Sequence, residues 1–306
     1  MRDFQLPGRS AVYARNGMCA TSHPLAAKVA IDILEQGGNA VDAAIAGAVL
    51  LGICEPQMTG IGGDCFVLLS PSDGGKVIAL NGSGRSPAAL SAQSLRDAGQ
   101  ATMPVYGVQS VTVPGAVDAF CRLSADWGRL GLDHVLAPAI RYAEEGVPVA
   151  PRVAADLAKP DAKLVGAARR FFLDNGRPFA LGSLFRAPAQ AEVLRRIAKE
   201  GRAGFYDGEV AEDMVASLRA AGGLHTEADF ANTACDYTEP VSGTYHDIDL
   251  VEHPPNGQGA TAILMLNILS HSDFSGLDPF GIQRTHLEAE VAKLAYFGLY
   301  ALQHRG

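Results

Sequence analysis

The stretch GIGGDCFVLL, residues 60–69, places three glycines directly before an apolar run. An apolar, alanine-rich segment (residues 40–54) precedes it, and the run CFVLL has the composition of a strand. A phosphate-binding glycine loop has the opposite order, because it needs a strand first and then a helix whose N-terminus faces the phosphates. The spacing also matches neither GxGxxG nor a P-loop. We therefore interpret Gly60, Gly62 and Gly63 as residues that allow a sharp turn and a close backbone approach between a helix and a strand.

Two helices are expected before this loop. Ser22 is suited to cap the first, Pro24 fits its first turn, and the glycine pair at residues 37–38 ends it. Asn39 is suited to cap the second helix, with Asp42 three residues later near its positive end. Because the second helix is apolar almost all round, we expect it to be packed centrally.

The rest of the chain reads as helices with a few strands. The predicted elements are a hairpin formed by residues 65–70 and 76–80, a strand at 108–115, helices at 116–127 and 134–146, a mainly helical stretch at 150–232, two short strands within 237–255, and helices at 259–269 and 285–304. We find no repeat and no clear linker, so the simplest organisation is a single domain over residues 1–306.

Composition restricts the class of protein. With 306 residues, 48% of them hydrophobic and 19% charged, the chain can bury a large core. The formal charge of −8 disfavours nucleic acid and anionic membranes as partners. Five cysteines without a CxxC pair indicate reduced thiols, with Cys54 and Cys65 expected to be buried. We see no signal peptide and no segment long enough to span a bilayer, and we expect a soluble, cytoplasmic protein.

The residues alone supply no complete catalytic set. Arg85, within NGSGRSPAAL, is able to bind a substrate carboxylate, but an ordinary surface arginine or a pairing with an internal acid is the simpler interpretation. His253 lacks a nucleophile or an orienting acid at a fixed spacing. The histidines are scattered and no GxSxG occurs, so we expect neither a metal, nor a cofactor, nor a serine-hydrolase elbow.

Several landmarks, taken in order, resemble the γ-glutamyltranspeptidase family from about Met18 to Tyr296. These landmarks are GGNAVDAA, the glycine loop with its following strand, SVTVPGAVDAF, FYDGEVAEDMVASLRAAGGLHTEADF and the Pro-Pro loop with the helix after it. The resemblance implies an α/β (α+β) N-terminal-nucleophile hydrolase, a four-layer αββα sandwich in which this chain is the helix-rich large-subunit part. Family members are precursors that cleave themselves, and the N-terminal threonine of the small subunit is the nucleophile.

The resemblance covers the large subunit alone, and no Thr-Thr-His cleavage signature occurs here. We therefore expect no catalytic residue in this chain, a small subunit of the same precursor as partner, and a small amide such as glutathione as substrate. A nucleophile in this chain, such as Thr21 after processing, is the least favoured alternative, since Thr21 is expected at a helix start. A further alternative is a catalytically inactive fragment that acts as a structural partner.

The substrate motif departs from the family pattern. Transpeptidases hold the α-carboxylate with the arginine of an Arg-Glu-x-Ala-Pro motif, and alignment on Pro87 places Ser83 at that position. Arg85 follows two residues later. The chain thus resembles the acylase-like branch, which includes cephalosporin acylases, and this amidase activity is an alternative to γ-glutamyl transfer. We predict Arg85 as the anchor of a substrate carboxylate, with Ser83 and Ser86 as neighbouring substrate-binding residues, and assign the loops at Gly60–Gly63 and Pro254–Gly259 to the wall and scaffold.

Overall fold

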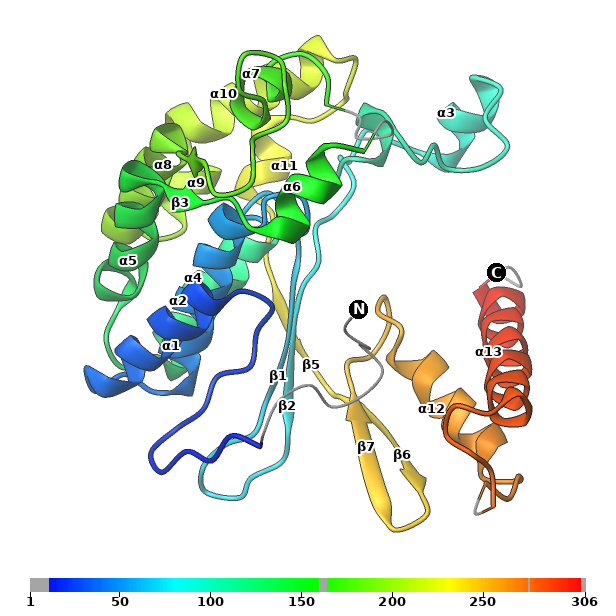
Figure 1. The fold of residues 1–306 in the computed structure, drawn as a ribbon. Coiled ribbons are helices and arrows are strands. Elements are labelled where there is room, and N and C mark those ends of the chain that lie inside the picture. The colour runs from blue at the N-terminus through cyan, green and yellow to red at the C-terminus, as the bar shows by residue number, and fades with distance from the viewer. Residues whose placement is uncertain (1–10, 160–163, 275, 304–306) are drawn as a thin grey trace. The chain divides into compact units, whose positions relative to one another are not determined.

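The computed structural model describes residues 11–159, 164–274 and 276–303 (Figure 1). The chain divides into two compact units built from interleaved segments. The first unit is formed from residues 1–64 and 84–233, and the second from residues 65–83 and 234–306, in each case within the described ranges. The single domain predicted from the sequence remains a prediction.

The first unit is helical (Figure 1). Its helices are α1 (Pro24–Glu35), α2 (Ala40–Cys54), α3 (Ala92–Asp97), α4 (Ala116–Trp127), α5 (Leu132–Glu145), α6 (Pro151–Leu157), α7 (Ala168–Phe172), α8 (Pro188–Glu200), α9 (Ala203–Tyr206), α10 (Gly208–Ala220) and α11 (Glu227–Ala231), with a short antiparallel pair, β3 (Val147–Pro148) and β4 (Leu184–Phe185). Helix α2 packs against α1, α4 and α5, and most of its residues are buried. The predicted central helix is confirmed.

The predicted cap of α2 is also confirmed. The side chain of Asn39 accepts hydrogen bonds from the backbone N–H groups of Val41 and Asp42, and Asp42 accepts one from the Asn39 N–H. Asp42 is completely buried and also accepts hydrogen bonds from the backbone N–H groups of Arg129 and Leu130. One carboxylate therefore holds both the start of α2 and the turn between α4 and α5.

The predicted cap of α1 is wrong. His23, not Ser22, is the N-cap, and its Nδ1 accepts a hydrogen bond from the Leu25 N–H at 3.2 Å. Ser22 instead donates its hydroxyl to Glu55, at the end of α2, at 2.5 Å. Burial lowers the pKa of His23, and the nearby charge of Glu55 opposes this effect. The neutral imidazole is the form that can accept the Leu25 N–H.

The second unit carries the longer strands (Figure 1). Strands β1 (Cys65–Leu69) and β2 (Ile78–Gly82) form the predicted antiparallel hairpin, and β5 (Asp236–Thr238) pairs with the other edge of β2. A second hairpin, β6 (Val241–Tyr245) with β7 (Ile248–Glu252), is followed by α12 (Gly259–Leu269) and α13 (Ile282–Gln303). The region after residue 235 thus has three strands rather than the predicted two.

The strand predicted at 108–115 is wrong. Residues Val108–Ser110 form a 3-10 turn, and the residues after it join no sheet. Backbone groups of this segment bond to loops and side chains instead, as described below, and Pro114 has no N–H to offer a strand partner.

All five cysteines are free. Cys54 is buried, and burial raises its pKa to about 12. Cys65 was expected to be buried but is only partly so, because β1 is an edge strand of its sheet. Among the described residues, no helix has both the length and the apolar character needed to cross a membrane.

Candidate functional site

The backbone around Arg85 is held from two directions within the first unit. The Arg85 carbonyl accepts a hydrogen bond from the Val113 N–H at 2.9 Å. Three residues later, the Ala88 N–H donates to Asp229 Oδ1, also at 2.9 Å. The side chains of Arg85 and Ser86 are exposed, whereas Pro87 is buried. The structure therefore presents an exposed arginine on a backbone that is held by hydrogen bonds at residues 85 and 88.

Gly84 lets this segment approach its neighbour closely. A Cβ at residue 84 would lie 2.0 Å from the Val113 carbonyl oxygen and 2.7 Å from Thr112 Oγ1, too close for any side chain. The Gly84 N–H donates to Asp64 Oδ1 at 2.8 Å. The close packing at Gly84 thus helps to determine where the backbone of Arg85 lies.

Ser83 belongs to the second unit, since the boundary between the units falls between residues 83 and 84. Its hydroxyl accepts a hydrogen bond from Asn256 Nδ2 at 2.8 Å, and its N–H donates to Asn81 Oδ1 at 2.9 Å. Asn256 lies in the Pro254–Gly259 loop, so this loop contacts a predicted substrate residue directly. Sequence reasoning missed Asn256, which is 173 residues from Ser83 along the chain. The substrate-binding roles of Arg85, Ser83 and Ser86 remain predictions.

The glycine loop supports the start of α4. The Gly63 carbonyl accepts hydrogen bonds from the Gly115 and Ala116 N–H groups at 3.0 and 2.9 Å. The close approach expected between helix and strand is instead one between α2 and the loop, and it depends on Gly52, where an added Cβ would lie 3.0 Å from Gly60 Cα. An added Cβ at Gly60 or Gly62 meets no atom within 4 Å, so the predicted need for glycine at these two positions is wrong. The predicted order of helix, loop and strand is confirmed. The N–H groups of the N-cap residue Gly115 and of the first residue of α4 therefore already have an acceptor, which is unlike a phosphate-binding helix end.

A buried network holds the segment that carries Val113. The Tyr206 hydroxyl donates to the Pro114 carbonyl at 2.7 Å and accepts from the Asp118 N–H at 3.1 Å. Arg202 Nε donates to Asp118 at 2.7 Å, and its guanidinium lies over the Tyr206 ring. Burial raises the pKa of Tyr206, so the hydroxyl stays protonated and can donate.

Two further residues hold the segments on either side of the bond between Arg85 and Val113: Asp229, which lies in α11, and His225, which lies just before α11. Asp229 closes a capping box with Thr226 in addition to its bond from Ala88. Burial opposes the ionisation of Asp229, but the hydrogen bonds from Ala88 and Thr226 outweigh it, and the pKa is lowered. A ring nitrogen of buried His225 lies 2.9 Å from the Val111 carbonyl oxygen.

We expect Tyr206→Phe to lower the free energy of unfolding by about 2 kcal/mol, because it removes two hydrogen bonds, the one donated to the Pro114 carbonyl and the one accepted from the Asp118 N–H. Urea denaturation of the chain measures this change. Tyr13→Phe is the control, since that side chain is 92% exposed and its loss of a hydroxyl should change stability by less than about 0.5 kcal/mol. Equal stability of the two variants would contradict the role given to Tyr206.

His253, considered above as a catalytic residue, makes contacts that fit a structural role. His253 is buried in the second unit with both ring nitrogens against carbonyl oxygens, those of Leu80 and Pro254, and its ring packs against Phe66. Thr21 lies just before α1, as expected. Within the described residues, no cluster of three or more His, Cys, Asp or Glu side chains is placed to hold a metal ion.

Solved structures with a similar backbone define the class of protein. γ-Glutamyltranspeptidase of Helicobacter pylori matches 94% of this chain, and 84% of its own, with a TM-score of 0.87 at 27% identity. Cephalosporin acylase from Bacillus halodurans matches 96% of this chain, and 56% of its own, with a TM-score of 0.86 at 40% identity. These similarities confirm the predicted α+β fold of an N-terminal-nucleophile hydrolase.

The chain belongs to the γ-glutamyltranspeptidase family, whose sequence profile matches residues 26–299. It is also 34% identical over 282 residues to the glutathione hydrolase-like YwrD proenzyme of Bacillus subtilis (strain 168). That alignment covers 91% of this chain and 53% of the relative. The chain thus spans about half the length of the curated relatives it matches.

Proposed function

We propose that this chain is the large-subunit part of an enzyme that hydrolyses or transfers the acyl group of γ-glutamyl or related amides, glutathione being one such substrate. Membership of the family over residues 26–299 supports the activity. The single structural observation that supports a role in substrate binding is the exposed Arg85 side chain on a backbone fixed by Val113 and Asp229.

In the proposed reaction, this chain positions the substrate and the remainder of the precursor supplies the nucleophile. A threonine hydroxyl attacks the amide carbonyl carbon, the threonine α-amine takes up the proton, and the departing amine leaves protonated. Backbone or side-chain donors stabilise the oxyanion formed on attack. Water or an acceptor amine then attacks the acyl-enzyme ester and frees the threonine. Arg85 binds the carboxylate of the acyl group through both steps.

We propose the small subunit of the same precursor as the partner. Helix α12 has the sequence GATAILMLNIL, yet only Gly259 and Thr261 are buried within the second unit. On β1 of the same unit, Phe66 and Leu68 are 42% and 41% exposed. Exposed apolar surface on this scale favours a partner that covers it. The part of the relatives' length that this chain does not span is a candidate for that partner. The cytoplasmic location stays a prediction.

The direct test is to express the complete precursor that contains this chain. We expect two bands on a denaturing gel and release of p-nitroaniline from γ-glutamyl-p-nitroanilide or from its glutaryl analogue, which lacks the α-amine. A precursor that stays as one band and releases nothing from either compound would overturn the proposal and favour the inactive structural partner.

A second candidate is an acylase for acyl groups other than γ-glutamyl, such as glutaryl. The observation that favours it is Ser83 at the position where the transpeptidase motif has arginine, together with 40% identity to the Bacillus halodurans acylase. In this case kcat/KM for glutaryl-p-nitroanilide exceeds that for γ-glutamyl-p-nitroanilide. The opposite ratio supports the γ-glutamyl function.

We expect Arg85→Ala to raise KM for the anionic glutaryl donor by about 10- to 100-fold, the equivalent of one lost charge-assisted hydrogen-bonded pair. Butyryl-p-nitroanilide has no carboxylate, so its KM should not change. The hydrogen bond of the residue 85 carbonyl does not involve the side chain and remains in the variant, and urea denaturation checks that the fold is kept. Steady-state kinetics with both donors measure the effect, and an unchanged KM for the glutaryl donor would remove Arg85 as the anchor.

A further inference from the structure

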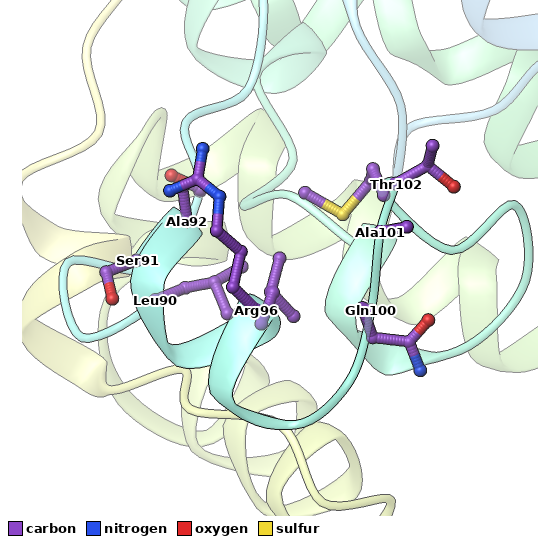
Figure 2. A pocket seen from close by; sticks show the side chains of 10 residues that line it. Leu90, Ser91, Ala92, Arg96, Gln100, Ala101 and Thr102 are labelled. Carbon is purple, nitrogen blue, oxygen red and sulfur yellow. The ribbon is translucent and has the colours of Figure 1, made fainter.

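A pocket of about 320 Å³ lies beside α3 in the first unit (Figure 2). It is formed by one continuous stretch, from Ser86 through α3 to Met103. Figure 2 shows the Arg96 side chain running along α3 beside Ala92, with Ala101 and Thr102 on the facing segment. The volume is within the range of small-molecule sites.

The lining combines one cation with an apolar wall. Arg96 is the only charged residue among the ten that line the pocket. Leu90, Leu95 and Met103 contribute apolar surface, while hydroxyl and amide groups come from Ser86, Ser91, Gln100 and Thr102. This combination suits an aliphatic chain that ends in a carboxylate, since a guanidinium binds that group in a paired geometry.

Arg96 has no acidic partner within the described residues. The adjacent Asp97 accepts a hydrogen bond from Gln93 at 2.7 Å and does not line the pocket. A position in the last turn of α3 explains a cation there by its attraction to the helix end. This position in the helix does not explain why an apolar pocket lies beside the cation. Arg219 has the same kind of position, in the last turn of α10, and yet lines none of the described pockets.

We propose that this α3 pocket binds the carboxylate-bearing leaving group of the amide substrate, with Arg96 on the carboxylate and Leu90, Leu95 and Met103 against an aliphatic side chain. The assignment rests on the proposed function, in which Arg85 already binds the acyl carboxylate. Arg96 supplies a second cation for a second carboxylate. An amino acid with an aliphatic side chain, joined through its amine, meets these requirements.

Binding to the chain itself tests the pocket without catalysis. The probes are 4-methylpentanoate, neutral 4-methylpentanamide and inorganic phosphate, titrated by calorimetry or NMR. We expect 4-methylpentanoate alone to bind, Arg96→Gln to weaken it by about tenfold or more, and Arg96→Lys to retain part of the affinity. Arg219→Gln is the matched control and should leave binding unchanged. Equal affinity for the amide, equal or tighter binding of phosphate, or an unaltered Arg96→Gln variant would overturn the proposal.

Kinetics of the complete, processed enzyme test the role in turnover. For γ-glutamyl-leucine we expect Arg96→Gln to raise KM about tenfold with kcat unchanged, while KM for γ-glutamyl-leucinamide stays the same. Turnover with the same KM in Arg96→Gln would remove the leaving-group role and leave the proposed function intact. A different outcome is that 4-methylpentanoate binds in an Arg96-dependent way, but the precursor neither cleaves itself nor turns over substrate. This outcome would overturn both the proposed function and the leaving-group role, and the pocket would remain a carboxylate-binding site alone.

Discussion

Replacing Asp42 with alanine is expected to lower the free energy of unfolding of the chain by about 4 kcal/mol. The Asp42 carboxylate is fully buried and accepts the N–H groups of Asn39, Arg129 and Leu130. Alanine would leave these donors without a partner in a region closed to water, and it would also remove a negative charge from the positive end of α2. The loss affects α2, α4 and α5 together, because Asp42 connects the start of one helix to the turn between the other two.

Urea denaturation of the chain measures this effect, with two variants that separate its causes. Asp42→Asn keeps one acceptor oxygen and should lose less stability than the alanine variant. Asp32→Ala removes a carboxylate of α1 that pairs on the surface with Lys28 and should cost less than about 1 kcal/mol. A loss in Asp42→Ala no greater than that in Asp32→Ala would show that the buried carboxylate contributes little to stability.

The elements predicted correctly are those whose determinants are close together in the sequence. Asn39 and Asp42 are three residues apart, so the capping box of α2 can be read directly. The hairpin of β1 and β2 follows from two apolar runs with a turn between them. The cap of α1 was missed because Ser22 bonds to Glu55, 33 residues away, which the local pattern does not reveal.

The strand expected at 108–115 does not form for the same reason, because several of its residues bond to partners that are distant in the sequence. Its composition fits a strand, but Val113 bonds to Arg85, and the carbonyls of Val111 and Pro114 bond to His225 and Tyr206. These partners lie on loops and helices, so tertiary contacts override local preference.

The candidate site shows the same limit. Arg85 is predicted from its residue type and from its place two residues after Ser83, which aligns with the family's arginine; both are visible in the sequence. The groups that hold its backbone are not, since Asp229 is 141 residues from Ala88. Gly84 was missed among 34 glycines because its conformation needs no positive φ, and the close approach that requires it appears only in three dimensions.

Gly84→Ala is expected to reduce kcat/KM of the processed enzyme for the glutaryl donor by about 100-fold, since displacing a substrate-binding group by about 1 Å has an effect of this size. The added methyl group would lie 2.0 Å from the Val113 carbonyl oxygen, so the two segments must separate. Separation strains the bonds that Arg85 and Gly84 make with Val113 and Asp64. Unfolding stability should fall by about 3 kcal/mol as well.

Gly62→Ala is the matched control for this variant, because a Cβ at residue 62 meets no atom within 4 Å and the residue has no positive φ. Its kcat/KM should remain close to that of the unmodified enzyme. If Gly84→Ala loses stability but keeps its KM for the glutaryl donor, the close approach is structural alone and the placement of Arg85 does not control substrate binding. A KM that rises for the glutaryl donor but not for the butyryl donor connects the packing at Gly84 to the carboxylate, since the two substrates differ only in that group.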